Sequence, residues 1–381
     1  MTDEAVWDVI VIGAGPAGAM AALQAARSGA QVLLLERESL PRYKLCGGGL
    51  IGLTLQSLPE GLQIPVLNQA RSATFTLNLG PERTRQAETV LIPMVMRDAF
   101  DATLVQSAVE QGVQIRTQVL VERVHRQDDE VVVHTKSGLL RARVVVGADG
   151  SSSRVARAAG ARFAQIDLGL EVEVEVPEQM QRQWEGRVLI DFGGVPGGYG
   201  WIFPKGDRLT VGAIAAKGHA DLQRNYLQGL LHRFDLAQFP QAVAAGHLTR
   251  CRTGDSPLAV DRLLLAGDAA GLLEPWTREG ISFAVRSGRL AGTAAADVAL
   301  GRRDWSTAAA EYRAAITGTL GAEMAVGFAA LAAYQRRPAA FARVLVGPGW
   351  RSFVRLARGE TTLARAGQRR PVRLALAALA R

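Results

Sequence analysis

Cysteine is scarce in this chain of 381 residues: Cys46 and Cys251 are the only two, and they lie far apart. This spacing excludes a disulfide-rich scaffold and a CxxC redox motif, and it suits a reducing compartment. Charged residues make up 21% of the sequence and hydrophobic residues 48%, which is typical of a globular protein rather than a disordered one. The length allows one large domain or two closely joined domains.

Long apolar runs are also missing, since no uncharged apolar stretch reaches the length of a membrane-spanning helix. The N-terminus carries Asp3 and Glu4 ahead of a short apolar run, so we expect no signal peptide. None of the five histidines falls in a motif, so we expect neither a metal site nor a catalytic histidine. These absences together predict a cytoplasmic protein.

Lysine and acidic residues are nearly absent from the end of the chain. Residues 336–381 contain eleven arginines, no lysine and one acid, Glu360, so this segment alone carries a charge of +10. The whole chain carries +8, which leaves −2 for the first 335 residues. The arginines either cover a helical surface in water or contact an anionic lipid or a phosphorylated substrate. No nucleic-acid-binding motif accompanies them, so we expect no nucleic-acid partner.

Within this basic segment, Arg351, Arg355 and Arg358 recur at helical spacing with apolar residues between them. An amphipathic helix that lies on an anionic membrane would have this pattern, so we expect the protein to contact the membrane peripherally. The alternative is a helical flap that packs on the protein's own second domain and leaves its arginines in water.

A glycine-rich turn follows the first apolar run, residues 8–12, and organises the N-terminal half. Gly13, Gly15 and Gly18 form a GxGxxG pattern that leads into a helix, and the next apolar strand ends at Glu36. Such glycines allow a tight turn, let backbone N–H groups approach a pyrophosphate and let the helix pack on the strand. The acid at the end of the second strand is placed to accept a ribose hydroxyl. This context predicts dinucleotide binding, and a purely structural turn is the alternative.

The remaining pattern predicts a second, antiparallel domain. Residues 168–176 alternate, with Glu171, Glu173 and Glu175 on one face, which we interpret as a half-exposed strand with a solvated acidic face. Further strands and helices are predicted at residues 72–79, 97–111, 113–124, 130–135, 139–146, 188–192, 199–203, 208–216, 220–234, 262–266 and 280–300.

Three more motifs complete the pattern: KLCGGGL from Lys44, GADGSSS from Gly147, and LLLAGDAAG from Leu263. With the GxGxxG turn they resemble FAD-dependent enzymes of the aromatic-hydroxylase superfamily. Two stretches are more specific, residues 41–50 and the run YGWIFPK from Tyr199. They resemble signatures of the geranylgeranyl reductase family, and the resemblance covers roughly residues 5–300.

The resemblance implies an α/β fold with a Rossmann-type FAD-binding domain interleaved with an antiparallel-sheet substrate domain, plus a C-terminal helical segment. The FAD-binding domain would comprise residues 1–70, 95–160 and 257–304. The substrate domain would comprise 71–94 and 161–256, and the basic helical segment 305–381.

The resemblance also implies which residues bind FAD. Some would hold the pyrophosphate and ribose, others would line the flavin, and Asp268 would bond a ribityl hydroxyl. The full set is Gly13, Gly15, Ala17, Gly18, Glu36, Arg37, Cys46, Gly47, Gly49, Arg97, Val121, Asp268, Gly280 and Ile281.

One position departs from the family. The usual Pro-x-x-Gly-Glu-Gly motif is here Pro275-Trp276-Thr277-Arg278-Glu279-Gly280, with Arg278 in place of a glycine. If that glycine required a positive φ, we expect a strained Arg278 or a rebuilt loop.

The implied activity is saturation of carbon–carbon double bonds in a polyprenyl chain carried by a lipid, pigment, quinone or diphosphate. Tyr199 and Trp201 would stabilise positive charge, and the Cys46 thiol would relay a proton. The sequence has no second unit of strand, GxGxxG turn and helix that could hold a nicotinamide cofactor permanently. The electron donor, NAD(P)H or ferredoxin, would therefore bind transiently. The alternatives are an FAD-dependent monooxygenase and a non-catalytic lipid-binding flavoprotein. Packing alone would also explain Cys46 and Trp201.

Overall fold

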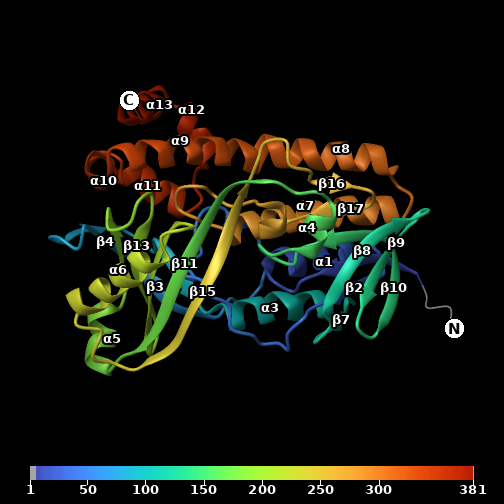
Figure 1. The fold of residues 1–381 in the computed structure, drawn as a ribbon, viewed down its shortest axis with the longest axis horizontal. Coiled ribbons are helices and arrows are strands. Elements are labelled where there is room, and N and C mark those ends of the chain that lie inside the picture. Colours follow the sequence, from blue (N-terminus) through green and yellow to red (C-terminus); the bar gives the residue numbers. More distant parts are fainter. Residues whose placement is uncertain (1–5, 381) are drawn as a thin grey trace.

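The computed structural model describes residues 6–380, which form two sheet-based regions side by side and a row of helices above them (Figure 1). One region has an eight-stranded, mainly parallel sheet and the other a seven-stranded, mainly antiparallel sheet. Strands β11 (Phe163–Glu175) and β15 (Gln241–Arg252) are the long strands that run through the middle of the molecule. This arrangement confirms the predicted fold class.

The parallel sheet is built around β1 (Trp7–Ile12), which lies between β2 (Val32–Leu35) and β10 (Gly138–Gly147) and runs parallel to both. β2 and the C-terminal halves of β1 and β10 are apolar because neither face of the sheet meets water there. The other strands and helices of this region are α1 (Pro16–Arg27), α3 (Arg97–Glu110), β7 (Gln114–Arg116), β8 (Val121–Gln127), β9 (Glu130–Thr135), α4 (Arg154–Ala158), β16 (Ala259–Val260), β17 (Leu263–Leu265), the 3₁₀ turn η1 (Gly267–Ala270) and α7 (Ile281–Ala299).

The single strand predicted over residues 113–124 was wrong, because two strands occupy this stretch. β7 pairs with β2, whereas β8 pairs with β9 in an antiparallel extension of the sheet. Gln118 between them has φ +58, a left-handed conformation that ends the first strand and redirects the chain.

The second sheet has the strand order β15-β11-β14-β13-β12-β4-β5. Residues 241–252 were not predicted as a strand, although β15 pairs with β11 over almost its whole length. The remaining elements of this region and its border are α2 (Thr54–Ser57), β3 (Val66–Ala70), β4 (Ser72–Leu77), β5 (Arg83–Gln86), β6 (Ile92–Val95), α5 (Glu178–Trp184), β12 (Arg187–Phe192), β13 (Tyr199–Lys205), β14 (Arg208–Ala216) and α6 (Ala220–Arg233). The proposed division of the chain into domain segments stays a prediction.

The acidic face of β11 is not solvated, which corrects the expectation for Glu171 and Glu173. Both side chains are 1% exposed, and only Glu175 meets water. The strand is covered on both faces: Val172 and Val174 pack into the core of the second sheet, and the glutamates face the segment around residues 43–46. Alternation alone cannot distinguish water from a polar loop as the cover.

The C-terminal helices pack on the second sheet through aromatic side chains. Tyr334, Phe341 and Trp350 are buried in one cluster with Phe75 and Phe192 of the sheet. The helices are α8 (Trp305–Ile316), the π-helical segment η2 (Thr317–Gly321), α9 (Ala322–Arg336), α10 (Pro338–Val346), α11 (Trp350–Ala357), α12 (Leu363–Gln368) and α13 (Arg370–Ala380).

Two features of these helices bear on the expected membrane contact. The apolar face of α11 is covered, since Phe353 stacks on Trp350 and meets Phe75 edge-on. By contrast, α13 has no buried residue, and its Leu374 is 56% exposed. Within residues 6–380 one helix, Trp305–Arg336, is long and apolar enough to cross a membrane by length and composition.

Candidate active site

A cleft of about 600 Å³ lies at the carboxyl ends of β1 and β2 and continues to the second sheet. Sheets of this type bind nucleotides at this position. Gly18 lies beneath the turn instead of lining the cleft, and Gly49 lines a second cavity. The other predicted residues line the cleft: Gly13, Gly15, Ala17, Glu36, Arg37, Cys46, Gly47, Arg97, Val121, Tyr199, Trp201, Asp268, Gly280 and Ile281.

The glycine turn is shaped by close backbone packing. Gly13 has φ +100, and a Cβ there would lie 2.4 Å from the carbonyl oxygen of Ala148. A Cβ on Gly18 would lie 1.7 Å from the carbonyl oxygen of Gly13. Helix α1 follows with no side-chain cap at Gly15, so its N-terminal N–H groups remain available to an anion.

Two arginines supply positive charge beside this turn. A Cβ built on Gly15 would have Arg42 and Arg97 guanidinium nitrogens 3.6 and 4.0 Å away. Asp101, which is buried, holds both arginines: Arg97 Nε donates at 2.8 Å and Arg42 Nη1 at 3.2 Å. A pyrophosphate at the turn would therefore meet the helix N-terminus and two fixed cations, which fits FAD.

Glu36 is tied to the turn rather than pointing freely into the cleft. Its Oε2 accepts from the backbone N–H of Ala14 at 2.9 Å, and its Oε1 accepts from that of Glu38 at 3.1 Å. Arg42 Nε lies 3.4 Å from the same carboxylate. These contacts fix the acid at the end of β2, where it is placed to accept ribose hydroxyls.

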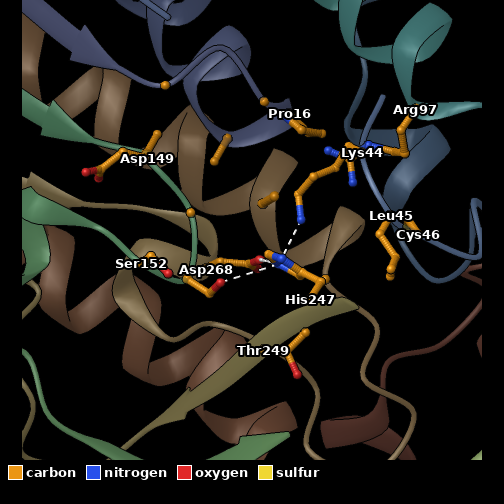
Figure 2. A pocket seen from close by; sticks show the side chains of 18 of the residues that line it. Pro16, Lys44, Leu45, Cys46, Arg97, Asp149, Ser152, His247, Thr249 and Asp268 are labelled. Atoms are coloured by element: carbon orange, nitrogen blue, oxygen red, sulfur yellow. Dashed lines mark hydrogen bonds and ion pairs between the residues drawn. The ribbon is translucent and has the colours of Figure 1, made fainter. Parts of the chain in front are cut away.

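A polar cluster that the sequence did not predict lies deeper in the cleft (Figure 2). Lys44 Nζ lies 2.7 Å from His247 Nε2, and His247 Nε2 lies 4.0 Å from Asp268 Oδ2. Burial lowers the pKa of Lys44 to about 8. Burial alone would raise the pKa of Asp268, but the nearby His247 and the charge of Lys44 bring it below its ordinary value. His247 was missed because it lies on the unpredicted strand β15.

The three glycines after Cys46 have close neighbours on all sides. A Cβ on Gly47 would lie 2.8 Å from the ring of Phe203, and one on Gly49 would lie 3.0 Å from Ile92. Gly48 has φ +71, and its Cβ would be 2.1 Å from the carbonyl oxygen of Val95. The backbone of this segment therefore approaches β6 and β13 very closely, which glycine permits.

Aromatic rings of β13 form the wall opposite this segment. Tyr199, Trp201 and Phe203 lie on one face with successive ring centroids 5.9 and 6.3 Å apart. Trp201 is 5% exposed, and its Nε1 has no hydrogen-bond partner among the described residues. Tyr199 donates its hydroxyl to the carbonyl oxygen of Thr277, and burial raises the pKa of this phenol above its ordinary value.

Arg278 has φ +56, so the residue that replaces the family glycine keeps the left-handed conformation that favours glycine. Its guanidinium reaches Asp167 at 3.2 Å and donates to the carbonyl oxygens of Trp276 and Gly197 at 2.7 and 2.9 Å. Both charged side chains are almost fully buried. Of the two expected outcomes, the structure therefore shows Arg278 in the left-handed conformation, with its side chain held by a buried ion pair that the sequence motif does not reveal.

Helix α7 begins directly after this loop, with Gly280 as an N-cap that offers no side chain. Glu279 Oε1 accepts from the backbone N–H of Ser282 at 2.6 Å. Burial raises the pKa of Glu279 to about 8, so this carboxyl group is largely neutral at pH 7.

A second cavity of about 160 Å³ adjoins the cleft. It shares Cys46, Gly47, Tyr199, Phe203 and Gly280 with the cleft wall. Its remaining wall is mainly apolar and includes Ile51, Ile92, Ile190, Phe192 and Trp276. Two of its residues come from the C-terminal helices, Leu345 of α10 and Phe353 of α11.

The mainly parallel sheet, the glycine turn and the cleft define a dinucleotide-binding protein. In agreement, the FAD binding domain family matches residues 6–313. The chain is 32% identical over 326 residues to digeranylgeranylglycerophospholipid reductase 3 of Methanosphaera stadtmanae, covering 78% of this chain and 79% of the relative. It is 29% identical to the chloroplastic geranylgeranyl diphosphate reductase of Oryza sativa subsp. japonica, covering 75% and 65%. The chain therefore belongs to the geranylgeranyl reductase family of FAD-dependent oxidoreductases.

Solved structures show the same fold. A geranylgeranyl bacteriochlorophyll reductase-like protein from Thermoplasma acidophilum superposes with a TM-score of 0.77. The alignment covers 98% of this chain and 99% of that one at 21% identity. The likeness extends through the C-terminal helices, which the sequence motifs do not reach.

Proposed function

We propose that this protein uses FAD to saturate carbon–carbon double bonds of a polyprenyl chain carried by a lipid, pigment, quinone or diphosphate. The observation that carries the proposal is the apolar cavity, which shares a wall with the cofactor cleft. Related proteins are named for digeranylgeranylglycerophospholipid and geranylgeranyl diphosphate, whose chains are long, apolar and unsaturated. Isoleucine and phenylalanine side chains in the cavity wall suit such a chain.

Bound FAD, once reduced, supplies a hydride to one carbon of the alkene. The N-terminus of α7 at Gly280 and Ile281 provides a partial positive charge for the anionic edge of the flavin ring. Lys44, Asp268 and the Gly13–Gly15 turn line the cleft and would hold the ring, ribityl chain and pyrophosphate.

Cys46, Tyr199 and Trp201 act on the substrate in this proposal. They lie where the cleft and the cavity meet, or in the aromatic wall beside that point. If the proton reaches the less substituted carbon ahead of the hydride, positive charge builds on the tertiary carbon, and the aromatic faces would stabilise it by about 2 kcal/mol when desolvated. The Cys46 thiol supplies the proton to the second carbon.

The electron donor is proposed to bind only transiently. The sequence has no second unit of strand, GxGxxG turn and helix for a permanently bound nicotinamide cofactor. Either NAD(P)H over the cleft or a ferredoxin at its mouth would serve as the donor. Stopped-flow reduction of the bound flavin with each donor distinguishes the two.

Contact with an anionic membrane is proposed for α13 instead of α11. Arg369, Arg370 and Arg373 are exposed at the start of α13, and Leu374 follows them with its side chain in water. Each arginine near an anionic surface contributes about 1 kcal/mol, and less at high salt. Such contact would bring the enzyme to a substrate that is too apolar to diffuse in water.

The experiment that tests the function is mass spectrometry of prenyl lipids after incubation with the reduced enzyme. Saturation adds two hydrogens for each double bond reduced. A monooxygenase would instead add an oxygen atom and consume O₂, and a flavoprotein that only binds lipid would leave the mass unchanged.

A further inference from the structure

The peptide of Cys46 is held from both sides by buried charges of the second sheet. Its N–H donates to Glu171 Oε1 of β11 at 3.1 Å, and its carbonyl oxygen accepts from Lys205 Nζ of β13 at 2.9 Å. Glu171 and Lys205 are each 1% exposed. Buried charges are expensive, so two of them on the peptide groups that flank one residue indicate a function that ordinary packing would not require.

The surrounding groups show how the charges balance. Tyr43 donates its hydroxyl to Glu171 at 3.0 Å and lies 3.3 Å from Glu173, so one phenol hydrogen serves two carboxyl groups. Glu173 also accepts from Thr210 at 2.8 Å, and Lys205 Nζ lies 4.0 Å from Glu173. Lys205 therefore faces two glutamates, and only Glu173 has a full set of hydrogen-bond partners.

Glu171 is the glutamate that is incompletely satisfied. Its Oε2 is buried and has no hydrogen-bond partner among the described residues. Burial and the charge of Glu173 raise the pKa of Glu171 to about 7, although Lys205, Cys46 N–H and Tyr43 act in the opposite direction. The strength with which it holds the Cys46 N–H therefore changes near neutral pH, because a carboxylate is a stronger acceptor than a neutral carboxyl group.

We propose that Glu171 and Lys205 form a clamp that positions Cys46 beside the flavin and the substrate. The two residues act through the Cys46 backbone and touch neither reactant, so they are positioning residues. The clamp also explains Gly48, because a Cβ there would lie 3.0 Å from Lys205 Nζ and block its approach. The proposal rests on the proposed function, since alkene reduction is the reaction that needs Cys46 in place.

Hydrogen–deuterium exchange of residues 42–48 in the FAD-bound enzyme tests the clamp. At pH 8, Glu171→Ala should accelerate exchange of this segment about tenfold, which is the effect of losing one charge-assisted hydrogen bond. Glu171→Gln keeps an acceptor oxygen, so its exchange should match wild type at pH 6 and exceed it at pH 8. The matched control is Glu175→Gln on the same strand, whose side chain is in water.

The kinetic arm separates positioning from folding. Glu171→Ala and Lys205→Met should lower kcat for alkene reduction about tenfold, with KM and the rate of flavin reduction unchanged. Exchange in Glu171→Ala equal to that in Glu175→Gln, at full FAD content, would overturn the clamp. Failure of the proposed function is recognised separately, because the wild type then leaves every polyprenyl chain unreduced.

Discussion

Replacing Arg278 by the glycine that the family normally carries should destabilise this protein. At most positions with φ +56, glycine removes strain, and here the gain would be about 1–2 kcal/mol. Arg278→Gly also removes the charged partner of Asp167, whose side chain is 2% exposed. Breaking a buried ion pair from one side costs about 3–5 kcal/mol, so the loss exceeds the gain.

The expected net effect is a loss of roughly 1–4 kcal/mol in the free energy of unfolding. Asp167 keeps one hydrogen-bond partner, since Gln165 Nε2 donates to it at 2.5 Å. The loss in free energy of unfolding should therefore stay below the upper end of this range. Adding Asp167→Asn to Arg278→Gly removes the unpaired charge and should recover at least half of the loss.

Urea titrations followed by tryptophan fluorescence measure these differences, with the slope of the transition checked for constancy. The informative comparison is the coupling between the two positions in a double-mutant cycle. An Arg278→Gly variant as stable as the wild type, or more stable, would refute the conclusion that the ion pair outweighs the backbone strain.

Four further predictions follow from the site and the C-terminal helices. Glu36→Ala should weaken FAD binding about 10–100-fold in a calorimetric titration, and Glu38→Ala should not. Trp201→Ala should lower the rate of alkene reduction about tenfold or more with FAD still bound, whereas Trp201→Phe should keep most of it; equal rates would assign Trp201 to packing alone. Folding favours the neutral form of Glu279, so FAD-free wild type should lose stability as pH rises from about 4.5 to about 8. Over that pH window, the free energy of unfolding of Glu279→Gln in urea titrations should fall by roughly 3–5 kcal/mol less than that of the wild type. If the two proteins instead lose stability in parallel, this carboxyl group titrates normally. Truncation after Gln368 should abolish co-sedimentation with anionic liposomes at low salt, and undiminished binding would exclude α13 as the contact.

The dinucleotide-binding half could be predicted because its signals are local. The apolar strand before Gly13, the uninterrupted helix after Gly18 and the acid at Glu36 lie within thirty residues of one another. Each follows from the conformation or packing of the residues beside it. The positive φ at Arg278 was likewise anticipated from the motif that it interrupts.

What the sequence did not reveal depends on partners that are distant in the chain. Asp167, which compensates Arg278, precedes it by 111 residues. The burial of Glu171 depends on Tyr43 and Lys205, which come from other elements. His247 carries no motif because its position is set by the pairing of β15 with β11. In each case a polar residue was assigned to water, or left without a role, because its partner is brought to it only by folding.

The apolar face of α11 shows the same limit in the C-terminal helices. Its alternation of arginines and apolar residues suits a membrane surface and the protein's own sheet equally well. The aromatic cluster around Phe75 covers Phe353 and so favours the flap over insertion of this helix. Periodicity indicates that a helix has an apolar face, and only the fold indicates what covers it.

The most direct test of the central claim is single-turnover reduction of a geranylgeranyl lipid by the FAD-loaded enzyme after dithionite reduction, read by mass spectrometry. Dithionite removes the dependence on the natural electron donor, so the result concerns the site alone. We expect a product heavier by two hydrogens for each double bond saturated, formed about tenfold more slowly, or slower still, in Trp201→Ala. A flavin that stays reduced while the lipid gains no hydrogen, under strict exclusion of oxygen, would contradict the central claim.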